Sequence, residues 1–130
     1  MNHNAEKPSY EFNDAKKEVK ITRYNTATPW MNYLSNGTFH TMISQAGGGV
    51  AFYRSPQIWR IIHYRFFHLP TDRSGFYVYI KDGDHIFCPT AEPVSEKPEH
   101  WCATHGMGYT KFESEHRGIK ADLRFHIGYK

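Results

Sequence analysis

Three residues that could bind zinc lie close together in the last third of the chain: His100, Cys102 and His105. Zinc accepts histidine nitrogen and cysteine sulfur, and Cys88 could supply the fourth ligand that structural zinc sites usually need. Their spacing is loose, however, and the alternative is ordinary polar histidines beside two reduced thiols. We therefore predict no metal site, and zinc binding stays the alternative.

Acids that could serve in general acid catalysis are Asp72, Asp82 and Asp84. All three lie in turn signals, where aspartate is expected to bond to nearby backbone. The chain lacks a nucleophile elbow, a dinucleotide fingerprint and a metalloprotease helix. The run Gly47–Gly49 has no following Lys-Ser/Thr pair, so it is not a phosphate-binding Walker loop. We therefore predict no catalytic residue in this chain.

Sugar recognition is the chemistry that the residue types favour. The apolar faces of sugar rings stack on aromatic side chains, and sugar hydroxyls pair with arginine, glutamine and aspartate. Such groups, Trp30 among them, gather near the glycine run, which is either a hairpin corner or a loop that approaches a ligand. The alternative is that most of the aromatic residues fill a core. The predicted substrate-binding residues are Gln45, Gly48, Tyr53, Arg54, Arg60 and Arg65.

The elements that would position these residues are predicted to be strands. Aromatic residues make up 16% of the chain, and alternating polar and apolar positions predict half-buried strands. Thr28–Trp30 is predicted to be a connection with an aromatic plug, and Pro89–Pro98 a surface loop. Asp82-Gly83 predicts a tight hairpin. The predicted strands are Tyr10–Phe12, Glu18–Tyr24, Thr38–Ser44, Val50–Arg54, Ile58–Phe67, Phe76–Ile80, His85–Cys88, Tyr109–Ser114 and Ile119–Ile127.

The last predicted strand has the clearest pattern. Ile119, Ala121, Leu123, Phe125 and Ile127 alternate with charged or polar residues. This pattern predicts one buried face, and partners that cover the edge of the strand.

The bulk properties suit one domain, or part of one, in 130 residues. The mean hydropathy is −0.69 and the formal net charge +3. The sequence shows no membrane span and no secretory signal, so we expect a soluble cytoplasmic protein. Basic residues are mostly interleaved with acids, and only Arg54–Arg65 is a basic segment without acids, so we expect no nucleic-acid partner. Residues 1–9 are predicted to be a disordered lead, and residues 10–130 the folded unit.

Short motifs follow one another in a recognisable order. They are Thr28–Leu34 (TPWMNYL), Ala46–Gly49 followed by Phe52–Arg54, Ile61–Arg65, Pro70–Asp72, Tyr79–Asp84, His105–Thr110 and Gly118–Ala121. In this order they resemble the opening region of cellobiose phosphorylase-like enzymes, glycoside hydrolase family 94. The resemblance runs from about Val19 to Phe125.

The resemblance implies an all-β fold, a partial antiparallel β-sandwich of the galactose-mutarotase-like supersandwich type that lacks its C-terminal strands. It implies a cytoplasmic, homodimeric parent enzyme whose catalytic (α/α)6 barrel this sequence does not contain. In such enzymes, inorganic phosphate is the co-substrate and attacks a β-linked disaccharide or oligosaccharide with inversion, which gives an α-sugar 1-phosphate and a free sugar. No other cofactor is implied.

The chain departs from the family pattern at Ile62-His63, where the family usually has Thr-Arg, and at Phe87–Pro89, where it has Trp-Ser-Pro. These departures leave the disaccharide preference open. The expected function is therefore that of the N-terminal carbohydrate-binding or structural domain of a cellobiose-type phosphorylase, inactive by itself. The alternative is a stand-alone carbohydrate-binding β module without catalysis.

Overall fold

The computed structural model describes residues 9–62, 74–94 and 96–129, and all the regular secondary structure in this part of the chain is β. The prediction of an all-β antiparallel fold is therefore confirmed. No helix in the described part could span a membrane. The strands are β1 (Tyr10–Asn13), β2 (Glu18–Ile21), β3 (Met31–Ser35), β4 (Phe39–Ser44), β5 (Gly49–Tyr53), β6 (Arg60–Ile62), β7 (Ile80–Asp82), β8 (His85–Phe87), β9 (His100–Gly106), β10 (Tyr109–His116) and β11 (Ile119–His126).

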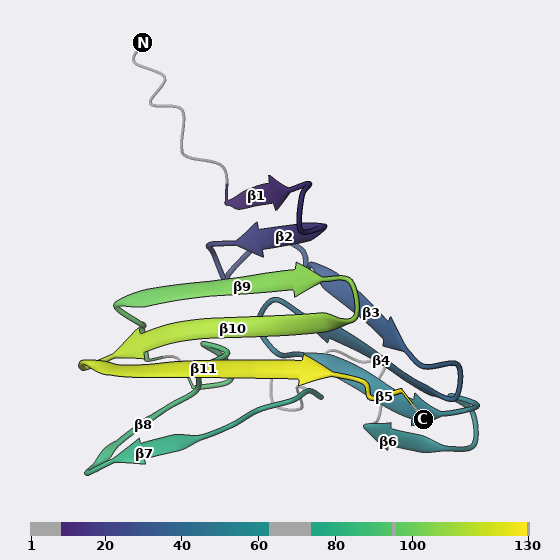
Figure 1. Ribbon diagram of the computed structural model, residues 1–130. Helices are drawn as coiled ribbons and strands as arrows, with labels where there is room; N and C mark the ends of the chain where they lie inside the picture. Colours follow the sequence, from purple (N-terminus) through teal and green to yellow (C-terminus); the bar gives the residue numbers. More distant parts are fainter. Residues whose placement is uncertain (1–8, 63–73, 95, 130) are drawn as a thin grey trace.

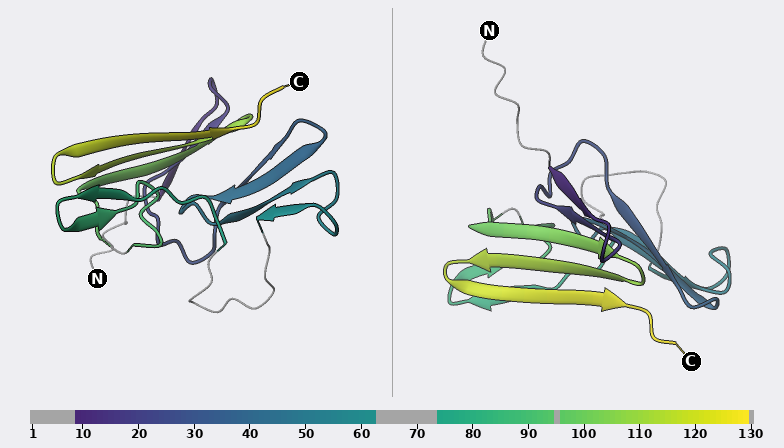
Figure 2. Two further views of the ribbon diagram at one scale, coloured as in Figure 1. Left: turned by 90° about the horizontal axis from the view of Figure 1, so that it is seen from below. Right: turned by 45° about the horizontal axis from the view of Figure 1, so that its top comes forward.

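The strands form three antiparallel sheets (Figure 1). The five-stranded sheet has the order β1-β2-β9-β10-β11, the four-stranded sheet the order β3-β4-β5-β6, and β7 and β8 form a separate hairpin. Figure 2 shows the two larger sheets as distinct layers, with the β7–β8 hairpin against one face of the five-stranded sheet. Every pairing in the larger sheets is between neighbours in sequence except β2 with β9, which adds the first hairpin, β1–β2, to one edge of the β9–β10–β11 meander.

The core lies between the facing sides of the two larger sheets. Leu34 and Ile43 come from the four-stranded sheet, and Trp101, Ala103 and Phe112 come from the five-stranded sheet. All five are nearly inaccessible to solvent. The strand β10 has the alternation of a strand with one face toward the core. Its even-numbered residues are buried and its odd-numbered residues are half-buried.

The hairpins that the sequence predicted are present. Tyr10 pairs with Ile21 across the first turn, Asp82 with His85 across the second, and β10 pairs with β11 along its whole length. The last hairpin is tighter than predicted, since β10 continues to His116 and leaves only two residues for the turn.

Two strands were missed, β3 and β9. The strand β9 is buried on both faces over much of its length, so it lacks the alternation that reveals a half-buried strand. The strand β3 begins directly after the predicted connection Thr28–Trp30.

The segment Phe76–Ile80 was predicted to be a strand because it has a strong local strand signal, and this prediction was wrong for residues 76–79. Within the described ranges residues 76–79 are assigned to no strand, and the strand β7 begins only at Ile80. Phe76 instead enters the core, where its ring lies 5.4 Å from that of Phe125. High β-propensity does not make a strand unless a neighbouring strand accepts its hydrogen bonds.

The predicted surface loop Pro89–Pro98 also needs correction. It contains no strand among its described residues, but Pro89, Thr90, Ala91 and Pro98 are buried. The loop is held inward because the Trp101 indole donates to the carbonyl oxygen of Pro89 (3.2 Å) and because Ala91 belongs to the core.

Two further predictions fall partly outside the described residues. The predicted strand Ile58–Phe67 is confirmed only for β6, since residues 63–67 are not described. The predicted disordered lead lies outside the described residues except for Ser9.

Candidate functional site

A hydrogen-bonded group of five residues joins the two larger sheets. We name Trp30, Asn32, Gln45, His105 and Thr110 the inter-sheet cluster. Asn32 lies on β3, His105 on β9 and Thr110 on β10, while Trp30 and Gln45 flank β3 and β4. The cluster lies where the chain passes from one sheet to the other.

Gln45 fixes the entry to β3. Its Oε1 accepts from the backbone N–H of Trp30 (2.8 Å), and its own backbone N–H donates to the carbonyl oxygen of Trp30 (3.1 Å). Its Nε2 donates to the carbonyl oxygen of Tyr24 (2.9 Å) and to Oγ1 of Thr26 (2.7 Å). The side chain is only 3% exposed, so these contacts satisfy a buried amide.

His105 connects the same backbone to β10. Its Nε2 lies 2.9 Å from the carbonyl oxygen of Trp30, and its Nδ1 lies 3.0 Å from Oγ1 of Thr110. A carbonyl oxygen only accepts, so Nε2 carries the proton and Nδ1 accepts from the Thr110 hydroxyl. Burial lowers the pKa of His105, and the hydrogen bond to Trp30 opposes this only in part. His105 is therefore a neutral structural histidine with both nitrogens occupied.

Asn32 completes the connection from the other sheet. Its Nδ2 donates to the carbonyl oxygens of Tyr109 (2.8 Å) and Gly106 (3.1 Å) and to Oγ1 of Thr110 (3.1 Å). One amide thus holds both sides of the β9–β10 turn. The donors and acceptors of the inter-sheet cluster are directed at one another. The role of the cluster is therefore structural, since it holds the two larger sheets in position.

The glycine run is the corner of the β4–β5 hairpin. The Gly47 carbonyl accepts from the backbone N–H of Phe76 (2.8 Å), and Gly48 forms a bridge with Gly75. A Cβ on Gly49 would lie 2.0 Å from the Met42 carbonyl oxygen. Close backbone packing within the protein therefore explains these glycines.

The predicted substrate-binding residues fall into two groups. Gln45 and Gly48 lie at the glycine corner, whereas Tyr53, Arg54 and Arg60 lie at the opposite end of β5. Tyr53 donates its backbone N–H to Trp59 (2.9 Å), and the Arg54 guanidinium lies 5.1 Å from the centre of the Tyr53 ring. Arg65 lies outside the described residues.

Arg54 has a positive φ of 58°. This left-handed conformation is uncommon for a residue with a long side chain. It is fixed by the hydrogen bond from the Arg54 backbone N–H to the carbonyl oxygen of Thr38 (2.7 Å). The end of β5 thus presents an arginine, a tyrosine and an exposed Trp59 together.

The three histidine and cysteine residues of the zinc alternative do not converge. They lie on β9, where alternation places His100 and Cys102 on one face and His105 on the other. Within the described ranges, no three histidine, cysteine, aspartate or glutamate side chains are grouped as a metal site would require.

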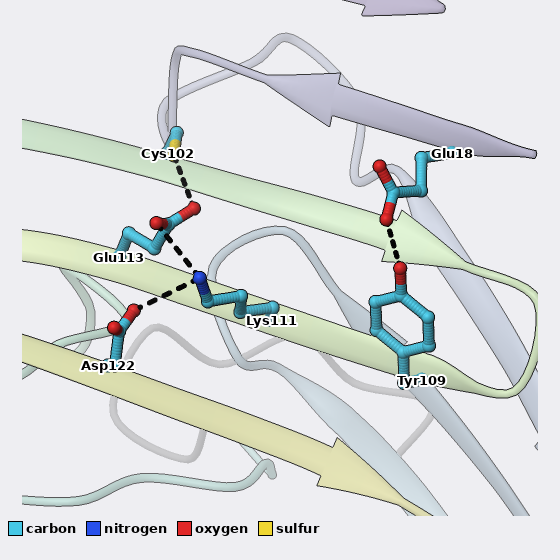
Figure 3. A network of polar contacts seen from close by, with 6 residues as sticks. All are labelled: Glu18, Cys102, Tyr109, Lys111, Glu113 and Asp122. Carbon is cyan, nitrogen blue, oxygen red and sulfur yellow. Dashed lines mark hydrogen bonds and ion pairs between the residues drawn. The ribbon is translucent and has the colours of Figure 1, made fainter. Parts of the chain in front are cut away.

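The outer face of the five-stranded sheet carries a polar network (Figure 3). Lys111 pairs with Glu113 (2.9 Å) and Asp122 (3.4 Å), and the Cys102 thiol contacts Glu113 (3.5 Å). Burial, reinforced by the Glu113 carboxylate, raises the pKa of Cys102 to about 11. Both cysteines are buried free thiols, so neither has the environment of a nucleophile.

A model of the glycosyl hydrolase 94 supersandwich domain matches residues 17–128. The chain belongs to glycosyl hydrolase family 94. It is 36% identical over 115 residues to an N,N'-diacetylchitobiose phosphorylase of Vibrio furnissii, covering 85% of the chain and 14% of that enzyme. It is 35% identical over 114 residues to the enzyme of the same description from Vibrio proteolyticus, with the same two coverages.

A more distant relative acts on a different disaccharide. It is the 3-O-beta-D-glucopyranosyl-beta-D-glucuronide phosphorylase of Paenibacillus borealis, 29% identical over 119 residues, which are 89% of the chain and 14% of that enzyme. The chain therefore spans about one seventh of the length of these relatives. What is shared is the supersandwich domain of family 94.

Sequence reasoning assigned no role to Asn32 and Thr110, and it considered His105 only as a ligand in the zinc alternative. The signal was nevertheless present, since all three lie in the motifs Thr28–Leu34 and His105–Thr110 that carried the family resemblance. The motifs marked the positions, but only the structure shows that they form one cluster.

Proposed function

We propose that this chain forms the N-terminal supersandwich part of a disaccharide phosphorylase. The observation that carries the proposal is the family match over residues 17–128, together with relatives that are phosphorylases by description. The parent reaction would be the phosphorolysis of a β-linked disaccharide by inorganic phosphate, with inversion. The chain would contribute structure and carbohydrate contacts, and the catalytic barrel would be supplied by other parts of the parent.

The residues proposed to contact sugar are Tyr53, Arg54 and Arg60. They lie together at one end of the four-stranded sheet, where an aromatic ring and guanidinium groups offer both stacking and hydrogen bonding. Gln45 and Gly48 belong to the same proposed region, Gln45–Arg65, but Gln45 is buried and would act by holding Trp30 and β3 in place.

The substrate and the setting remain proposals as well. Cellobiose and N,N'-diacetylchitobiose are the first disaccharides to test. The latter is chosen because the two Vibrio relatives are N,N'-diacetylchitobiose phosphorylases by description. We further propose a cytoplasmic, homodimeric parent that needs inorganic phosphate as co-substrate and no other cofactor. It would bind neither nucleic acid nor membrane.

A chimeric enzyme tests the proposal. The segment of the Vibrio furnissii phosphorylase that aligns with residues 17–128 is replaced by the corresponding residues of this chain. The folded chimera should release sugar 1-phosphate from N,N'-diacetylchitobiose. A folded chimera without phosphorolysis, tested also on cellobiose, would contradict the proposed function.

The same chimera tests the sugar contacts. Arg54→Asn removes the guanidinium and suits the left-handed backbone, which asparagine tolerates better than most residues. We expect a several-fold higher KM for the disaccharide and an unchanged KM for phosphate. Arg117→Asn is the matched control, since Arg117 also has a positive φ but lies in the β10–β11 turn. Equal KM values for Arg54→Asn and the parent chimera would remove the sugar contact.

The stand-alone carbohydrate-binding module is the second candidate function. The exposed Trp59 beside Tyr53 and Arg54 favours it, because exposed aromatic rings can stack on sugars. The purified chain should then show disaccharide-dependent tryptophan fluorescence that Trp59→Ala abolishes. Saturable binding by the isolated chain, combined with an inactive folded chimera, would favour this function over the phosphorylase.

A further inference from the structure

The turn between β3 and β4 contains the pair Asn36-Gly37. In such a pair the backbone nitrogen of the glycine can attack the side-chain amide carbon of the asparagine, because glycine has no Cβ to block the approach. Gly37 is exposed, and nothing lies within 4 Å of the position that a Cβ would occupy. Its φ of 86° is one that glycine adopts readily. The groups around the turn therefore decide how fast this attack occurs.

The attacking nitrogen is hydrogen-bonded to a serine–histidine pair. The Gly37 N–H donates to Oγ of Ser35 (3.0 Å), and this Oγ lies 2.9 Å from Nδ1 of His40. Ser35 and His40 face one another in the β3–β4 ladder, and the His40 ring stacks on Phe52 with centroids 5.0 Å apart. When the proton of the neutral imidazole is on Nε2, Nδ1 accepts from the Ser35 hydroxyl. The pair then connects the Gly37 proton to a base.

The amide of Asn36 is held at both of its polar atoms. Its Oδ1 accepts from the backbone N–H groups of Phe39 (2.8 Å) and Thr38 (3.1 Å). Two N–H donors on one oxygen stabilise the negative charge that forms there when the neighbouring carbon is attacked, as in the oxyanion holes of acyl-transfer enzymes. Its Nδ2 donates to the carbonyl oxygen of Gly128 (2.9 Å). The amide is therefore oriented before any reaction begins.

We propose that Asn36 is a self-modification site that deamidates within the folded hairpin. The Gly37 nitrogen forms a bond to Cγ of Asn36, and its proton passes through the Ser35 hydroxyl to Nδ1 of His40. The bond between Cγ and Nδ2 then breaks, and Nδ2 leaves as ammonia with the proton returned from His40. The product is a cyclic succinimide. Water opens this ring at either carbonyl carbon and gives aspartate or isoaspartate.

The products lose the contact that Asn36 makes with Gly128. Aspartate has no N–H on its side chain, and its carboxylate oxygen would face the carbonyl oxygen of Gly128. Isoaspartate also adds one methylene to the main chain of the turn. The reaction would therefore detach the segment that follows β11 from the β3–β4 turn, and it would do so irreversibly because ammonia is lost.

Mass spectrometry of the digested chain tests the proposal, because it separates the asparagine, aspartate and isoaspartate forms of the turn. The full 130-residue chain is incubated at neutral pH, and circular dichroism establishes that it is folded. We expect Asn36 to react about tenfold faster in the folded chain than in a synthetic peptide of residues 33–42. Asn25 is exposed but precedes a threonine, so it is the internal control and should stay intact over the same time.

Two variants remove the proton path and keep the Asn-Gly pair. Ser35→Ala lacks the hydroxyl, and His40→Phe lacks the base but retains a ring that can stack on Phe52. Each should slow the reaction in the folded chain about tenfold, to the rate of the peptide, and Ser35→Thr should restore it. Tyr33→Phe removes an exposed hydroxyl from the same strand, so it is the matched control and should react like the wild-type chain.

The sign of these changes separates assistance from protection. If the hairpin protected Asn36 by fixing its side chain, the folded wild-type chain would react more slowly than the peptide, and Ser35→Ala would react faster than the wild type. Either result would overturn the proposal, as would equal rates for the wild-type chain and both variants. The comparison of the wild-type chain with the peptide needs no variant, so it decides the question even if Ser35→Ala or His40→Phe does not fold.

Discussion

Histidines buried without charge make the stability of this protein sensitive to acid. Burial lowers the pKa of both His105 and His116 from the ordinary value of 6.5. The unfolded chain therefore binds protons more readily than the folded one below that pH. The stabilisation is complete above pH 6.5 and is lost as the pH falls through the lower folded pKa values. We expect the urea midpoint to fall between about pH 7 and about pH 5.

The variant His116→Phe checks this origin. The His116 ring stacks on Phe87 with centroids 4.3 Å apart, and both its nitrogens and the hydroxyl of Ser114 are buried without a hydrogen-bond partner among the described residues. An aromatic ring without nitrogens keeps the stacking and removes the two unsatisfied nitrogens, so stability at neutral pH should rise by about 1 kcal/mol. The loss toward pH 5 should become smaller. A lower stability at neutral pH would contradict this account.

Cys102 should be almost inert in the folded state. With a pKa of about 11, only about one thiol in a thousand is ionised at pH 8, and the thiolate is the reactive form. We expect iodoacetamide to modify Cys102 in urea but not under native conditions, as read by mass spectrometry. Glu113→Gln removes the carboxylate that raises the pKa and should accelerate modification. Rapid native alkylation of the wild-type chain would show that the thiol is more accessible than the structure indicates.

The β4–β5 hairpin depends on a glycine at position 49 for steric reasons. A Cβ at this position would lie 2.0 Å from the carbonyl oxygen of Met42, which is backbone of the paired strand and cannot move alone. Gly49→Ala should cost about 3 kcal/mol or more in the free energy of unfolding. Gly128→Ala is the control, since nothing lies within 4 Å of its Cβ and it should be neutral. Equal urea midpoints for the two variants would refute the steric argument.

The elements that the sequence revealed are those with local signals. The Asp82-Gly83 turn and the alternation of Ile119–Ile127 describe hairpins whose partners are adjacent in sequence. The strand β9 gave no such signal, because both of its faces are buried over much of its length and its histidines resembled metal ligands. Residues 76–79 show the opposite error, since their strong β-propensity predicted a strand that is not present in the part of the chain that the structure describes.

The sequence motifs predicted where residues of the inter-sheet cluster lie in the chain, but not which of these residues contact one another. Gln45 was expected to face a sugar, yet its amide is used by Trp30, Tyr24 and Thr26. Which polar groups satisfy one another depends on contacts between residues about 75 positions apart, such as Asn32 with Gly106 and Tyr109. No local spacing in the sequence encodes those contacts.

At the scale of the whole molecule, the two sheets are joined through the inter-sheet cluster. Asn32→Leu removes the hydrogen bonds that the Asn32 amide donates to the carbonyl oxygens of Gly106 and Tyr109 and to the hydroxyl of Thr110. We expect a loss of about 2 to 4 kcal/mol in the free energy of unfolding, measured by urea denaturation. Asn25→Leu at an exposed position is the matched control and should change stability by less than about 0.5 kcal/mol. A difference no larger than the control's would mean that the core alone holds the sheets together.

The hydrogen bond from His105 to Trp30 has a spectroscopic consequence. A buried imidazole proton on Nε2, directed at the carbonyl oxygen of Trp30 in the connection before β3, exchanges slowly with solvent and gives its own nuclear magnetic resonance signal. That signal exists only when the end of the Thr28–Trp30 connection is seated against β9. One proton therefore reports whether the layers of this domain have docked, in the isolated chain and in any larger enzyme that contains it.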